Sequence, residues 1–363
     1  MRRLCHLPFS AALLAAVPAL CAPSPPAPVI ESADVAAQFD QIVDFAVADG
    51  FAGRVVVANR SSIIYDRLAG YSDAAGKVPV RADTLFHVAS ITKYLTAILI
   101  LKSAEEGRLD LDQNIGLFLA DTGLAERDVT VRQLLSHHSG MGSSYAAENE
   151  QTAEAAIAAI EKQPIDPEKV GKFRYSNDGY DLLGIILEQV YGQRYEDILR
   201  EKIAGPAGLS QTFAWSEADK TDPNVVSQPL SEISEKLYRR NYGMLGSAGL
   251  LTTAIDLVEL QRALVREQIV NSDSLSELWK PRDRISIGQT TFGGFLRESE
   301  KMGPVFNVRG NEDWGDNAIM NHYLDHGLFV AVVTSKGPAE DSGKKPFRDS
   351  ISRAIEFVLP RLP

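Results

Sequence analysis

Apolar positions near the N-terminus recur first at the spacing of a helix and then at the spacing of strands. Residues 31–49 predict a helix that stops at Gly50, because one helical face collects the apolar side chains. These side chains are Val35, Phe39, Ile42, Val43 and Ala46. Two strand-like runs follow at residues 51–58 and 63–69, joined by a polar turn at residues 59–62. The pattern therefore predicts a helix followed by a hairpin.

The middle of the chain keeps to the helical spacing. A long apolar run begins near Ser90 and ends at the polar residues 105–107. A short helix is predicted at 130–136, where Thr130 opens the segment as a cap. Further helix-like segments lie at residues 152–162, 181–192, 195–203 and 253–265. This part of the chain is predicted to be helical.

Strand-like runs return in the C-terminal part. They lie at residues 290–296, 304–308, 318–323 and 328–334. The chain closes with a helix whose apolar face contains Phe347, Ile351, Ala354, Ile355 and Val358. Strands at both ends with helices between them predict an α+β fold, in which helices are inserted into one antiparallel sheet. The sheet lobe is expected at about 31–102 and 285–363, and the helical lobe at about 103–284, within one domain of residues 31–363.

The first residues have the pattern of a signal peptide. Arg2 and Arg3 precede an apolar stretch at residues 7–20, and small residues follow near Ala22. We therefore expect residues 1–22 to be removed and the protein to be exported, either to the periplasm or as a secreted product. A lipoprotein would need Cys21 as the modified residue, but Leu20 is large for that signal. The Pro-rich residues 23–30 are interpreted as a tether.

Composition narrows the chemistry of the predicted mature chain. Its two cysteines, Cys5 and Cys21, both lie in the leader, so a chain cut after Ala22 has neither a disulfide nor a thiol nucleophile. Loss of Arg2 and Arg3 changes the formal charge from −11 to −13. An acidic product without a basic block is a poor candidate for nucleic acid or anionic lipid. No other segment is long and apolar enough to span a membrane.

The first candidate for chemistry is Ser90-Ile-Thr-Lys93 at the start of the apolar run. In a helix, Lys93 lies one turn after Ser90 on the same face and can assist removal of the serine proton. Backbone N–H groups at the helix start can stabilise an oxyanion. The spacing alone is weak, because Ser342-Gly-Lys-Lys345 also matches it in a segment that we interpret as a solvated loop.

The second candidate is Tyr175-Ser-Asn177. In a turn, both side chains can face one cleft, where Tyr175 would relay a proton. Asn177 would bind Lys93 or a substrate carbonyl. The alternative is an aromatic plug at a loop–helix junction, with Asn177 as the N-cap of the helix.

Together, Ser90-x-x-Lys93 and Tyr175-x-Asn177 resemble the serine β-lactamase-related family. That family groups class C β-lactamases, D-alanyl-D-alanine carboxypeptidases, D-aminopeptidases and β-lactamase-like esterases. The similarity extends in order from about residue 51 to 334, through the segments 129–141, 175–212 and 246–257. It implies the β-lactamase/transpeptidase fold, catalytic roles for Ser90, Lys93 and Tyr175, and no metal or organic cofactor.

The third motif of the family departs from the pattern. Family members usually carry Lys or His, a small residue and then Gly on the strand beside the cleft. Here Arg309 aligns with the Lys or His and Asn311 with the Gly, or, one residue shifted, Gly310 takes the Gly position and Arg309 moves out. Arg309 could bind a carboxylate but not act as a base, and a backbone N–H near Asn311 would complete the oxyanion hole. The cluster at residues 312–316 suggests an altered cleft wall, and the alternative for it is a solvated hairpin loop.

Histidines add no metal site to this interpretation. His137 and His138 are adjacent and point to different sides, and no third ligand is spaced nearby. The resemblance makes His137 a structural residue, and His87 is expected to pack at a strand end.

Two functions from different classes follow. The first is an exported serine hydrolase that forms an acyl-enzyme on Ser90, with esters, D-amino-acid amides or peptides, or β-lactams as substrates. Esterase or carboxypeptidase and aminopeptidase activity is favoured over β-lactamase activity, because the third motif is altered. The second is a non-catalytic module of the same fold that binds cell-wall peptide or a partner protein. The oligomeric state does not follow from the sequence.

Overall fold

A computed structural model describes residues 32–73, 76–120, 122–218, 238–312, 315–336 and 346–362. The predicted leader and tether, both cysteines and the second match at Ser342–Lys345 lie outside the described residues. So do Asp313 and Trp314, at the end of the third motif.

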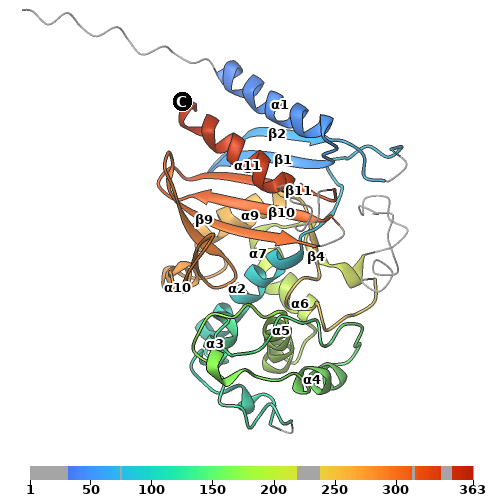
Figure 1. Cartoon of the computed structure of the whole chain (residues 1–363), viewed down its shortest axis with the longest axis vertical. Coiled ribbons are helices and arrows are strands. Elements are labelled where there is room, and N and C mark those ends of the chain that lie inside the picture. Colours follow the sequence, from blue (N-terminus) through green and yellow to red (C-terminus); the bar gives the residue numbers. More distant parts are fainter. Residues whose placement is uncertain are drawn as a thin grey trace, which may run out of the picture.

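One eight-stranded antiparallel sheet forms the middle layer of the molecule (Figure 1). Its strand order is β2-β1-β11-β10-β9-β8-β7-β6. The strands are β1 (Gly53–Asn59), β2 (Ile63–Ala69), β6 (Arg284–Ile285), β7 (Gly288–Thr290), β8 (Phe295–Ser299), β9 (Gly303–Asn311), β10 (Asn317–Tyr323) and β11 (Leu328–Thr334). Strand β1 pairs with β11, from Gly53 opposite Thr334 to Asn59 opposite Leu328. The prediction of one antiparallel sheet built from both ends of the chain is confirmed.

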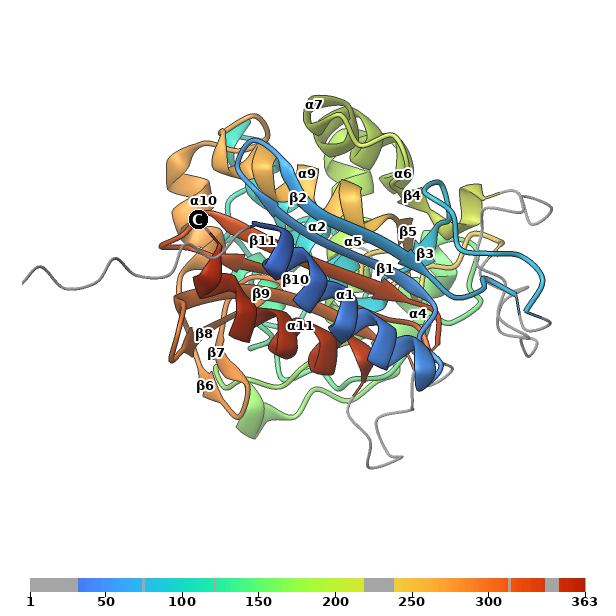
Figure 2. The same ribbon diagram turned by 90° about the horizontal axis from the view of Figure 1, so that it is seen from above.

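Two terminal helices cover one face of this sheet. Helices α1 (Ser32–Ala48) and α11 (Phe347–Val358) lie side by side across the strands (Figure 2). Alternate residues of β1 divide between the two faces: Val55 and Val57 pack under these helices, whereas Val56 and Ala58 join the core on the other face. Because helices cover both faces, the central strands read as nearly continuous apolar runs.

The other face carries the nucleophile helix and the helical layer. Helix α2 (Thr92–Glu105) is buried on all sides, which explains an apolar run without a polar face. Helix α9 (Ala254–Val265) falls within the stretch predicted as the helical lobe, but it contacts β1, β10 and β11. The remaining helices are α3 (Val131–Leu135), α4 (Ala153–Glu161), α5 (Asn177–Tyr191), α6 (Tyr195–Leu199), α7 (Gly205–Ala207) and α10 (Ser272–Trp279).

A small second sheet contains the strand that precedes Ser90 in the chain. Its strands β3 (Phe86–His87), β5 (Leu250–Thr252) and β4 (Phe213–Ala214) are antiparallel, with β5 in the centre. Strand β3 leads directly into a 3₁₀ turn, Ala89–Ile91, and then into α2. The α+β fold class predicted from the sequence is confirmed.

Candidate active site

Ser90 lies in a sharp turn between β3 and α2. Ala89, just before it, has φ of 46°, a left-handed conformation that costs a residue with a Cβ about 1–2 kcal/mol. This turn places Ser90 in the first turn of the helical segment, as predicted. Ser90 is partly exposed, whereas its neighbours Ala89 and Ile91 are fully buried. The hydroxyl is therefore the accessible group of the turn.

Lys93 is buried, with 2% of its surface exposed, and its amine meets three oxygen atoms. The Nζ atom lies 3.2 Å from Ser90 Oγ, 2.8 Å from Asn177 Oδ1 and 2.9 Å from the backbone oxygen of Ser247. An ammonium group would donate to all three. A neutral amine would donate to Asn177 and Ser247 and accept the proton of Ser90. The geometry thus fits both forms of a group that exchanges a proton with Ser90.

Tyr175 reaches the same hydroxyl from the loop before α5. Its phenol oxygen lies 2.7 Å from Ser90 Oγ, and Lys93 Nζ lies 4.8 Å from the centre of its ring. Ser176 caps α5, because its Oγ accepts from Gly179 N at 3.0 Å. Asn177 is therefore the first helical residue rather than the N-cap, and the alternative reading that made it the cap is wrong. Tyr175 faces the cleft and contacts Ser90, whereas Asn177 contacts Lys93, as predicted for it, but does not line the cleft.

His137 supports Tyr175 from behind. Its ring lies 4.6 Å from that of Tyr175, centre to centre, and its Nδ1 accepts from the backbone N–H of Ser176 at 3.1 Å. Burial, with the nearby charges of Lys93 and His138, holds the pKa of His137 well below its ordinary value. The ring is therefore neutral, with the proton on Nε2. The structural role that the resemblance implied agrees with this packing.

The strand wall of the cleft approaches Ser90 at Gly310. A Cβ built on Gly310 would lie 1.9 Å from the carbonyl oxygen of Val88 and 3.1 Å from Ser90 N. Only a glycine fits this contact. Of the two registers left open by the sequence, the structure has the one with Gly310 in the glycine position. Val308 then stands where relatives carry Lys or His, and it is buried in the core.

Arg309 therefore does not occupy the Lys or His position of the third motif. It still lines the cleft, but its guanidinium pairs with Asp349 of α11. The neighbouring Arg348 donates to the backbone oxygen of Gly310 and to Asn311 Oδ1, the latter at 3.1 Å. Residues 309–311 belong to β9.

Arg348 and Asp349 were not identified from the sequence. They occupy the polar side of α11, whereas the sequence pattern indicates only its apolar face. No local motif marks them, because their partners on β9 are distant in the chain.

His87 joins three segments around the nucleophile. Its Nδ1 lies 3.2 Å from Asp316 Oδ2, and its Nε2 lies 2.6 Å from the backbone oxygen of Ala248. Burial alone would lower the pKa of His87, but the hydrogen bond and charge of Asp316 outweigh it and raise the pKa. His87 also packs 4.7 Å from the ring of Trp215, in the packing role expected for it. The charged ring ties β3 to the β9–β10 turn.

Ser90, Lys93, Tyr175 and Arg309 border a cleft of about 530 Å³. Besides the polar groups, apolar side chains line it: Tyr145, Phe173, Ile287 and Phe295. Asn177 lies beneath it, in contact with Lys93. The cleft is therefore large enough for a small amide or ester and offers an apolar wall to a substrate side chain.

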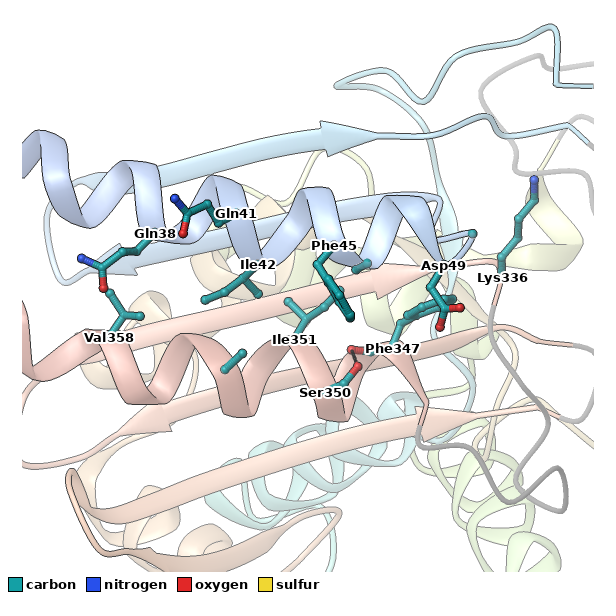
Figure 3. Close-up of a pocket in the computed structure, with 13 residues that line it drawn as sticks. Gln38, Gln41, Ile42, Phe45, Asp49, Lys336, Phe347, Ser350, Ile351 and Val358 are labelled. Carbon is teal, nitrogen blue, oxygen red and sulfur yellow. Dashed lines mark hydrogen bonds between the residues drawn. The ribbon is translucent and has the colours of Figure 1, made fainter.

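A larger hollow, of about 960 Å³, lies between α1 and α11 (Figure 3). Ile42, Phe45 and Ile351 face one another along it, and Asp49 and Lys336 lie towards one end. Its lining includes Ser350 and Lys336, but Ser350 Oγ donates to the backbone oxygen of Phe347, and the hollow lies on the opposite face of the sheet from α2. The chemistry is therefore assigned to the smaller cleft.

In the part of the chain that the structure describes, no group of three or more His, Cys, Asp or Glu residues is placed to hold a metal ion. Within the same residues, no helix combines the length and apolarity needed to cross a bilayer.

Comparison with known proteins agrees with this geometry. The profile of the family named Beta-lactamase matches residues 37–352. Penicillin-binding protein 4* of Bacillus subtilis (strain 168) is 27% identical over 338 residues, which cover 85% of this chain and 72% of that protein.

Two solved structures resemble the chain as a whole. The octameric penicillin-binding protein homologue from Pyrococcus abyssi superposes with a TM-score of 0.74 at 24% identity, covering 90% of this chain and 78% of the other. D-amino acid amidase from Ochrobactrum anthropi SV3, complexed with L-phenylalanine, gives 0.76 at 22% identity, with 90% and 98% covered. At these identities the two structures show a shared fold. Since the family profile spans most of the sequence, the chain belongs to the β-lactamase family and has the serine β-lactamase/transpeptidase fold.

Proposed function

We propose that the protein is a serine hydrolase that forms an acyl-enzyme on Ser90. One observation carries the proposal: the Ser90 hydroxyl lies within hydrogen-bonding distance of both Lys93 Nζ, at 3.2 Å, and Tyr175 OH, at 2.7 Å. A serine needs such neighbours to lose its proton as it attacks. A residue that only packed in this place would need neither group.

The geometry supports a two-step reaction. The Ser90 proton passes to Lys93 or Tyr175 while Oγ forms a bond to the substrate carbonyl carbon. Backbone N–H groups of Ser90 and of β9 beside Gly310 would hold the resulting oxyanion. Collapse breaks the bond to the leaving amine or alcohol, which takes up, through Tyr175, the proton that the base received from Ser90. Water then attacks the carbonyl carbon of the acyl-enzyme and gives a proton to the same base. The bond to Ser90 Oγ breaks, Oγ takes that proton, and the product leaves as a carboxylic acid.

The substrates that we propose are esters and D-amino-acid amides or peptides, ahead of β-lactams. The names of two similar proteins support this class, since one is a penicillin-binding protein and the other a D-amino acid amidase. The third motif supports the ranking, because Val308 replaces the Lys or His of the family. Arg309 remains a candidate for contact with substrate, and Asn311 and Gly310 for the oxyanion hole.

We also propose that the protein is exported. The signal-peptide pattern of residues 1–22 supports this, as does similarity to a penicillin-binding protein, a class whose name refers to a cell-wall-directed drug. Mass spectrometry of the N-terminus from the exported fraction would test the cut after Ala22. An intact leader in that fraction would contradict it.

The decisive experiment is the intact mass of the protein after incubation with a fluorophosphonate probe. A single adduct on the wild type that is absent from Ser90→Ala would establish an activated Ser90. A substrate screen of esters, D-alanyl peptides and penicillins would then follow. No adduct on either protein, both being folded, would overturn the hydrolase proposal in favour of a binding module of the same fold.

A further inference from the structure

Asp181 is a fully buried carboxyl group whose charge interacts with that of Lys93. It lies on α5 one turn after Asn177, the residue that accepts from Lys93, so both side chains share one face of the helix. Asp181 Oδ1 accepts from the backbone N–H of Gly246 at 3.2 Å. The carboxyl also interacts with the hydroxyl of Ser247, the residue after Gly246. Removing a carboxyl group from water is costly, so its presence here calls for an explanation.

Asp181 and Lys93 hold the same piece of backbone. Gly246 gives its N–H to Asp181, and the next residue, Ser247, receives the Lys93 amine on its carbonyl at 2.9 Å. This segment has no room to move towards α5, since a Cβ on Gly246 would lie 2.1 Å from the backbone oxygen of Tyr180. The segment is therefore a rigid link between the carboxyl and the amine.

The pKa of Asp181 is raised above that of an exposed aspartate. Burial raises its pKa to about 8, against the opposing charge of Lys93, and Asp178 on the same helix raises it further. Tyr145, from the segment after α3, and Tyr195 of α6 are the other ionisable groups that sense its charge. Lys93 of α2 is the cation among them. Burial thus favours the neutral form of Asp181, and the charge of Lys93 favours its ionised form.

We propose that Asp181 is a positioning residue for Lys93. As a neutral acid it holds the Gly246–Ser247 backbone against the amine, and when it ionises it retains Lys93 in the ammonium form. An ammonium group cannot take the proton of Ser90. Asp181 releases its proton to solvent, Lys93 keeps three protons, and no bond to substrate is involved.

The direction of the effect does not depend on which group is the base. A negative charge beside the Ser90 centre stabilises the protonated form of either Lys93 or Tyr175. Replacing Asp181 by a neutral residue of the same shape therefore moves the rise of activity with pH to lower pH. A charge within a few ångströms usually changes such a titration by about one to two pH units.

This inference rests on the proposed function, so the test compares rates of Ser90 modification by the fluorophosphonate probe between pH 5 and about 10. In Asp181→Asn, we expect the rising limb about one to two pH units lower than in the wild type. Asp256→Asn is the matched control. Asp256 is also a buried carboxyl with a pKa raised by burial, but it binds Thr212 and Gln211 outside the cleft. Its profile should match that of the wild type.

The outcomes separate the two proposals. A wild type that forms no adduct at any pH overturns the proposed function itself. A reactive wild type whose profile superimposes on that of Asp181→Asn overturns the role of Asp181. If Asp181→Asn does not fold, Asp181→Thr, which is also neutral and of similar volume, must show the same shift. A purely structural role would lower the melting temperature without moving the limb.

Discussion

The two walls of the cleft hold their polar groups in different ways. On the helical wall, side chains from α2, the loop before α5 and the start of α5 bond directly to one another around Ser90. On the strand wall, the backbone of β9 at Gly310 comes closest to the nucleophile, and the nearby guanidinium groups bond to Asp349, Gly310 and Asn311. One wall therefore offers side-chain acids and bases, and the other offers shape and backbone donors.

This difference bears on how the proposed reaction could proceed with an altered third motif. In that reaction, proton transfer from Ser90 uses groups on the helical wall. The strand wall would supply a close backbone, and Gly310 allows that close approach. Each prediction below alters one wall and asks whether the other can act without it.

The largest effect is expected from removing the nucleophile itself. Ser90→Ala should lower ester or amide turnover at least about a thousandfold, because Ser90 carries the hydroxyl that both Lys93 and Tyr175 contact. The free energy of unfolding should change by less than about 0.5 kcal/mol, since the hydroxyl is partly exposed. Turnover and thermal melting measure the two. Turnover equal to the wild type would show that the helical wall is not the chemical one.

The next effect concerns the strand wall. Gly310→Ala forces β9 away from Val88 by an ångström or more, and a misplacement of about 1 Å can cost about a hundredfold in rate. We expect a loss of that order in the acylation rate, with overpacking that destabilises the fold by about 1–3 kcal/mol. The acylation rate of the folded fraction is the measurement.

Gly142→Ala is its control. The nearest atom to a Cβ there is the end of the Arg174 side chain, at 3.4 Å, which can move aside. Its acylation rate should be close to that of the wild type. Equal rates for Gly310→Ala and Gly142→Ala would mean that the approach of β9 to Ser90 is not needed.

The contributions of the two buried histidines to folding stability should change with pH in opposite directions. The folded-state pKa of His87 is raised, so its contribution to stability is present below its ordinary value of 6.5 and is lost as pH rises through the folded pKa. That of His137 is lowered, so its contribution is present above 6.5 and is lost as pH falls.

Denaturant unfolding of His87→Gln and His137→Asn at several pH values tests this pair. Asn is chosen because His137 has φ of 60°, a conformation that Asn tolerates. The deficit of His87→Gln relative to the wild type should shrink above pH 6.5, and that of His137→Asn should shrink below it. Deficits that are constant with pH would contradict the charge states assigned to both rings.

The smallest effect is expected at Arg309. Because Asp349 already engages its guanidinium, Arg309→Ala should raise KM for carboxylate-bearing substrates only about two- to threefold and leave neutral esters unchanged. Asp349→Asn should release the guanidinium and lower the same KM. A tenfold rise for Arg309→Ala would instead make it a principal carboxylate ligand.

The fold and the helical wall could be predicted because their signals are local. Short apolar runs at both ends predicted the sheet, and Ser90-x-x-Lys93 and Tyr175-x-Asn177 lie on single turns, where spacing determines direction. The strand wall could not be predicted in the same way. A shift of one residue in β9 exchanges Arg309 for Gly310 at the cleft, and only the contact with Val88 selects the register.

Asp181 and Arg348 illustrate a second limit. An aspartate or arginine within an amphipathic helix ordinarily indicates a solvated face. Both are buried here, because neighbours from distant parts of the chain cover them. Their surroundings depend on tertiary packing that the periodicity of one helix does not contain.

The pairing of β1 with β11 also sets the order in which the protein can mature. Gly53 is synthesised long before its partner Thr334. Strand β9, which carries Gly310, also leaves the ribosome long after Ser90. A nascent chain therefore has the Ser90 segment before it has the sheet, and such long-range pairing slows folding. The cleft can form only after β9 and β11 have both been synthesised.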